Sequence, residues 1–127
     1  MTNLNITEPT TIGLSDSTHS LLKRLKDDEH FAEMADAYRF AIALAIAKGI
    51  EPPELGTPRT TVFSVATIDP DRDIANAIKS LVDTGDLPVY RLAERFAEWG
   101  VIELSRQSAA GTLDIGSILT EVSSQGD

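Results

Sequence analysis

The stretch TTIGLSDSTHSLLKRLKDDEHFAEMADAYRFAIALAIAKGI, residues 10–50, places a short β-prone segment ahead of two helical patterns, one polar and one very apolar. Apolar and small residues alternate over Thr10–Leu14, which predicts a short strand. Ser15 and Asp16 are both residue types that cap helix N-termini, so the first helix is expected to begin directly after the strand. The stretch therefore predicts a strand followed by two helices.

The second helical pattern, from Phe31 to Lys48, is the most apolar segment of the chain. Its residues 40–47, FAIALAIA, include no polar side chain, and a helix that is apolar all round is buried on every side. Gly49 is suited to end this helix in a left-handed conformation. Because a domain of this size offers little surface to cover such a helix, we expect a second copy of the chain to pack against it. The residues predicted to take part in this self-association are Ile12, Leu14, Tyr38, Phe40, Ile42, Leu44 and Ile46.

The remainder of the chain carries further strand and helix patterns. The β-branched and aromatic stretch TTVFSVATI, residues 60–68, predicts a second strand. The segment 69–85 predicts a helix, with its first Asp as cap and the following Pro at the first helical position. A longer helix is expected from Pro88 to about Arg106, and a short one in TLDIGSILTEV near the C-terminus.

These patterns predict a mainly α fold with one or two short strands, divided by a linker. The proline- and glycine-rich segment EPPELGTPR, residues 51–59, is typical of such a linker. It would separate a strand-helix-helix oligomerisation module, residues 1–50, from a strand plus acidic helical part, residues 60–127.

The composition is that of an ordinary soluble globular protein, with 42% apolar and 24% charged residues. Cysteine is absent, which excludes disulfides and thiolate chemistry. No apolar run approaches the length that spans a bilayer, and the N-terminus does not resemble a signal peptide. We therefore expect a cytoplasmic protein without membrane contact. The formal net charge is −9, which disfavours a general electrostatic grip on nucleic acid.

The pattern GLSDSTHSLLKRL (13–25) followed by FAEMADAYRFAIALAIAKG (31–49) resembles the ribbon-helix-helix family. The resemblance implies a ribbon-helix-helix-like N-terminal module and an obligate dimer, in which paired strands form a ribbon that enters the major groove of DNA. The layout is also similar to the small ribbon-helix-helix-like subunit of bacterial DNA phosphorothioation systems, which implies a protein without a catalytic centre.

The residues that would contact DNA depart from the family pattern. On the exposed face of the strand only Thr11 carries a side chain able to reach a base, because Gly13 has none. The loop KDDEH, residues 26–30, would repel phosphate. We therefore expect DNA contact to be weak or absent and, where it occurs, to use phosphate. The candidate DNA and phosphate contacts are Lys23, Arg24, Lys26, Arg39 and Thr11.

The sequence carries no recognisable catalytic or metal-binding pattern. His19 and His30 are the only histidines, too few for a metal site without further ligands. The DPDRD segment at 69–73 lacks the glycine and glutamate that a calcium loop requires. Neither a P-loop nor a nucleophile elbow occurs. The prediction is a protein that is not an enzyme, with no cofactor and no metal.

The helix expected after Pro88 carries carboxylates and aromatic residues. Glu94 and Glu98 are expected to lie on its solvated outer face. Tyr90 and Trp99 form a candidate partner surface, since aromatic residues dominate interface energetics; the alternative is that they belong to the core.

These observations favour a non-enzymatic, oligomeric accessory or scaffold subunit of a bacterial DNA-modification or defence-type system. Its expected partners are itself, as a dimer or higher oligomer, and another protein of the same system. One alternative is a ribbon-helix-helix antitoxin or transcriptional autoregulator whose acidic C-terminal half binds a toxin. Another is an acidic inhibitor that mimics DNA.

Overall fold

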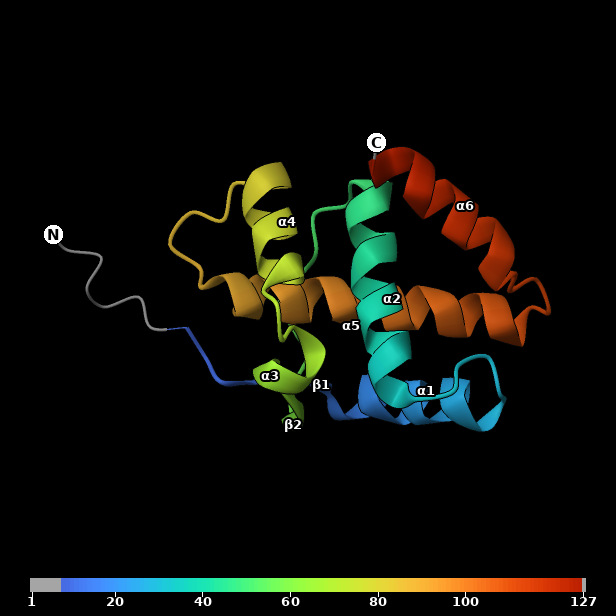
Figure 1. Cartoon of the computed structure of the whole chain (residues 1–127). Helices are drawn as coiled ribbons and strands as arrows, with labels where there is room; N and C mark the ends of the chain where they lie inside the picture. The colour runs from blue at the N-terminus through green and yellow to red at the C-terminus, as the bar shows by residue number, and fades with distance from the viewer. Residues whose placement is uncertain (1–7, 127) are drawn as a thin grey trace, which may run out of the picture.

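The computed structural model describes residues 8–126 and is mainly helical, with one two-stranded sheet (Figure 1). The expected fold class, mainly α with short strands, is therefore confirmed. The elements in chain order are β1 (Thr11–Ser15), α1 (Asp16–Asp27), α2 (Met34–Lys48), β2 (Arg59–Ser64), α3 (Val65–Ile68), α4 (Asp73–Leu81), α5 (Val89–Ala109) and α6 (Ile115–Gly126).

The core is built where the long helix α5 crosses α2 (Figure 1). The two backbones approach closely at Gly100, where a Cβ atom would lie 2.1 Å from the Ala41 carbonyl oxygen. Glycine therefore allows α5 to lie directly on α2. The cover that we expected from a second copy of the chain comes from α5 of the same chain, with α1 and α6 also packed against α2.

The sheet joins the two parts of the chain that the predicted linker separates. β1 pairs antiparallel with β2, with Thr11 opposite Ser64 and Ser15 opposite Arg59. The register shifts between Ile12 and Gly13, which is the signature of a β-bulge. A Cβ atom at Gly13 would lie 2.0 Å from the backbone oxygen of Thr60, so the close approach of the strands requires glycine there.

The two parts of the chain on either side of residues 51–59 do not pack as separate units. β1 and α2 come from the first part and β2 and α5 from the second, yet these four elements share one hydrophobic cluster. The segment 51–59 therefore connects parts of a single core. Periodicity within each half could not show this, because the contacts run between the halves.

Several element boundaries differ from those expected. The second strand ends at Ser64, whose side chain accepts a hydrogen bond from the Thr67 backbone N–H and so caps α3. The helix predicted from 69 begins at Asp73 instead. Asp69 still acts as a cap, because its carboxylate accepts hydrogen bonds from the backbone N–H groups of Ile74 and Ala75.

Two predicted helix ends are confirmed. Ser15 is the N-cap of α1, and its side chain accepts from the Thr18 backbone N–H. Gly49 ends α2 in the left-handed conformation, with φ of 67°.

Within residues 8–126, no helix combines the length and apolarity needed to cross a membrane.

Candidate functional site

The outer edge of β1, the edge that does not face β2, is occupied by buried side chains of α5. The Glu98 carboxylate, 6% exposed, accepts hydrogen bonds from the Ser15 backbone N–H at 3.0 Å and from the Ser15 hydroxyl at 2.7 Å. The Thr18 hydroxyl donates to the same carboxylate at 2.7 Å. A buried carboxylate is costly unless it is hydrogen-bonded in this way, so Glu98 fixes the junction between β1 and α1.

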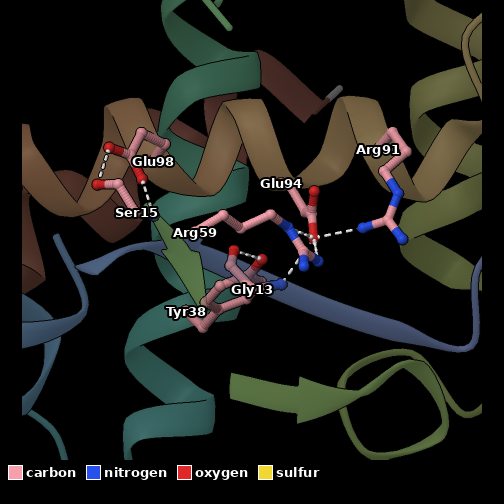
Figure 2. Close-up of polar contacts among 7 residues, drawn as sticks. All are labelled: Gly13, Ser15, Tyr38, Arg59, Arg91, Glu94 and Glu98. Atoms are coloured by element: carbon pink, nitrogen blue, oxygen red, sulfur yellow. Dashed lines mark hydrogen bonds and ion pairs between the residues drawn. The ribbon is translucent and has the colours of Figure 1, made fainter. Parts of the chain in front are cut away.

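Glu94 lies one helical turn earlier on α5 and is also buried, with 3% of its surface exposed. Its Oε2 atom accepts a hydrogen bond from the Gly13 backbone N–H at 2.8 Å and one from Arg91 Nη1 at 2.7 Å. Arg59 donates to the same oxygen through Nε and Nη2. Figure 2 shows both carboxylates pointing from α5 toward β1, with two guanidinium groups converging on Glu94.

Tyr38 completes the closure of this edge from α2. Its hydroxyl donates to the Gly13 carbonyl oxygen at 2.9 Å (Figure 2). Burial, reinforced by the nearby Glu94 carboxylate, raises the pKa of Tyr38 well above its ordinary value. The phenol therefore stays protonated and remains a donor.

The backbone of β1 is thus hydrogen-bonded on both sides. On one side β1 pairs with β2, and the flanking backbone groups of Thr10 and Asp16 bond to Val65 and Pro58. On the other side, Gly13 and Ser15 donate to carboxylates of α5. An edge occupied by side chains cannot pair with a strand of another molecule.

A pocket of about 340 Å³ opens beside Glu94. Three arginines line it, Arg59, Arg91 and Arg95, together with Leu55 and Leu87. The arginine side chains are 31%, 34% and 28% exposed, respectively. This pocket therefore gathers three of the 11 basic residues of a strongly acidic chain.

The predicted DNA contacts are separated by the structure into available and engaged residues. Lys23, Arg24 and Lys26 are exposed on α1, and Thr11 is exposed on β1. Arg24 forms an exposed ion pair with Asp28 at 4.0 Å. Arg39 is engaged, because its guanidinium donates to the carbonyl oxygens of Thr67 and Ile68 at 3.0 Å and to Asp36 at 2.9 Å. Arg39 therefore anchors α3 to α2.

The residues predicted for self-association lie mostly inside the chain. The fully buried members are Ile12, Leu14, Tyr38, Ile42 and Leu44. Phe40 and Ile46 are half-buried and pack against the same core. In this fold the buried members offer no surface to a second copy.

The two aromatic candidates for a partner surface have different environments. Tyr90 is buried, which corrects its placement on a surface, and its hydroxyl donates to Asp69 Oδ2 at 2.8 Å. Burial, together with this hydrogen bond, raises the pKa of Tyr90 to about 12. Trp99 is half-buried and packs against the core. Tyr90 was a candidate for a partner surface because it is aromatic, with the core as the alternative; its burial supports the alternative.

Glu94 and Glu98 were expected on the outer face of their helix, and the structure shows the opposite. The sequence did contain a signal. The spacing of four residues from Tyr90 to Glu94 to Glu98 places both glutamates next to the apolar stripe that includes Ala97 and Val101. A carboxylate beside such a stripe needs donors, and β1 supplies them.

Comparison of the chain with known protein families, with curated proteins and with solved structures found no match. Among the side chains that the structure describes, residues 8–120, no group of three or more histidine, aspartate or glutamate residues is arranged to hold a metal ion. The structure thus defines a small, mainly helical protein whose most elaborate polar arrangement closes the edge of a strand.

Proposed function

We propose that this chain is a non-enzymatic accessory subunit of a bacterial DNA-modification or defence-type system, and that it contacts DNA through phosphates alone. The setting of the proposal rests on the resemblance of residues 13–49 to the ribbon-helix-helix family. The observation that supports contact without base reading is the closed outer edge of β1. The hydrogen bonds of Gly13 and Ser15 to Glu94 and Glu98 occupy the edge that a ribbon dimer would use.

Base reading by a ribbon requires two paired strands with polar side chains on the exposed face. In β1 only Thr11 is exposed, and the following residues are buried. Lys23, Arg24 and Lys26, by contrast, are exposed along α1. This arrangement favours a weak contact that does not depend on DNA sequence.

The antitoxin alternative receives less support. It assigns toxin binding to the C-terminal half, but α5 is the main cover of α2 within the shared core. The face of α5 that covers α2 is therefore not available to a toxin. An accessory subunit that binds its partners with its folded surface fits the packing better.

The DNA contact is tested by titrating random duplex DNA with the protein at several salt concentrations. We expect weak binding. In Lys23→Ala/Arg24→Ala/Lys26→Ala the slope of log affinity against log salt should fall by about one unit for each phosphate-binding side chain that is removed. Lys79→Ala, on α4, is the matched control and should leave the slope unchanged. Tight, sequence-specific binding that Thr11→Ala abolishes would contradict the proposal. Undetectable binding would contradict the proposed contact with DNA phosphates.

A further inference from the structure

The arginine pocket beside Glu94 carries more positive charge than its own carboxylate can neutralise. Arg59 and Arg91 both donate to a single oxygen of Glu94. Arg95 lies in the same pocket, and its one carboxylate partner among the described residues is Glu54, at 3.9 Å. Three arginines and two carboxylates line the pocket, so its interior keeps one positive charge with Glu54 counted and two when the exposed Glu54 side chain turns away.

Glu54 does little to offset this charge. Its side chain is 84% exposed, and its distance from Arg95 exceeds that of a hydrogen bond. Exposed ion pairs of this kind contribute little energy and break readily. Arg95 can therefore turn to a ligand while the packing of the fold stays as it is.

The arginines are also held in position before any ligand arrives. Glu94 is buried and fixed by the Gly13 backbone N–H, and it orients Arg59 and Arg91. Each guanidinium carries five N–H donors in a planar fork, and Glu94 uses only some of those on each arginine. Preorganised donors of this kind lower the entropic cost of binding.

The chemistry of the pocket fits a phosphate more closely than a carboxylate. A phosphate monoester carries nearly two negative charges at neutral pH and three acceptor oxygens, which suits a pocket lined by three arginines and one buried carboxylate once the exposed Glu54 side chain turns away. A carboxylate supplies one charge and two oxygens. The side chains of Leu55 and Leu87 also line the pocket, where an apolar part of the ester can lie.

We propose that Arg59, Arg91 and Arg95 form a binding site for a phosphate monoester, with Glu94 as the buried carboxylate that positions two of the arginines. The site shares no residue with the exposed basic residues of α1, which are Lys23, Arg24 and Lys26. It can therefore be tested separately from the DNA contact proposed there.

The test is a titration of the full chain, followed by amide chemical shifts in NMR spectra. The probes are inorganic phosphate, phenyl phosphate, benzoate, and a short oligonucleotide with and without a 5′-phosphate. We expect saturable binding of phenyl phosphate, with the shifts concentrated around Arg91 and Arg95. Benzoate should bind about tenfold more weakly or worse, because it has one charge fewer and forms fewer charge-assisted hydrogen bonds.

Three variants make the result specific. Arg95→Gln should weaken phenyl phosphate binding about tenfold or more without changing the melting temperature, because Arg95 has no close structural partner among the described residues. Arg95→Lys should restore part of the affinity. Arg106→Gln, on the same helix but exposed and paired with Glu103, is the matched control and should bind normally.

The probes also distinguish the two sources of such a phosphate. Stronger binding of the 5′-phosphorylated oligonucleotide than of both the unphosphorylated one and phenyl phosphate would identify a strand end as the ligand. Equal binding of the two oligonucleotides, with saturable binding of phenyl phosphate, would identify a small ester; either result supports the site. The proposal is overturned if phenyl phosphate does not saturate, if benzoate binds equally well, or if Arg95→Gln binds like the unaltered protein.

Discussion

Gly100→Ala is expected to push α5 away from α2 and to lower the free energy of unfolding by about 3 kcal/mol or more. The added Cβ atom would lie 2.1 Å from the Ala41 carbonyl oxygen and 2.7 Å from the Ala41 Cα atom. Both are backbone atoms, so no side chain can rotate away to make room. The helices must separate, and the apolar packing along their crossing is loosened.

The measurement is urea unfolding followed by circular dichroism. Gly116→Ala is the matched control, because a Cβ atom there would meet only the Asp114 side chain, at an ordinary contact distance of 3.5 Å. This control should be neutral or slightly stabilising, since alanine favours helix over glycine. Equal stability of Gly100→Ala and the unaltered protein would show that α5 does not lie on α2 as described.

Ile42→Asp is expected to lower the free energy of unfolding by about 4 kcal/mol or more, enough to unfold much of the protein at room temperature. Ile42 lies on α2 with 1% of its surface exposed, inside the cluster shared by both halves of the chain. An aspartate there would be a buried charge without a partner. The protein should lose helical signal or melt at a much lower temperature.

Ile102→Asp provides the comparison, because Ile102 is a helical isoleucine with 46% of its surface exposed. Its effect on the melting temperature should be small. If Ile42→Asp dissociated an oligomer but left each chain folded, Ile42 would belong to an interface between chains. The intrachain core would then be contradicted.

The sequence predicted local structure well because local structure depends on neighbouring residues. Ser15 as a cap and Gly49 as a helix end both follow from short-range backbone chemistry, and both are confirmed. The burial of α2 expected from FAIALAIA is confirmed in part, because four of these residues are buried and four are half-buried. The buried ones are Ala41, Ile42, Leu44 and Ala45, and the half-buried ones are Phe40, Ala43, Ile46 and Ala47. What covers α2 could not be predicted, because periodicity shows that a surface is buried and does not show which segment buries it.

The polar closure of β1 could not be predicted, for a related reason. The spacing of Glu94 and Glu98 places them next to an apolar stripe, but charged side chains are rarely fully buried unless they are paired, and the sequence does not show what pairs with these two. Their partners lie far away in sequence, with the Gly13 N–H 81 residues from Glu94. Such a pairing becomes visible once the chain is folded and β1 lies beside α5.

The central claim is that β1 pairs within its own chain and that α5 closes its other edge. An isotope-filtered nuclear Overhauser experiment on a sample mixed from labelled and unlabelled protein tests this most directly. The account predicts contacts of Thr11 with Ser64 and of Leu14 with Thr60 inside one chain, together with slow exchange of the Gly13 and Ser15 amides. Contacts between the β1 strands of two chains would contradict it.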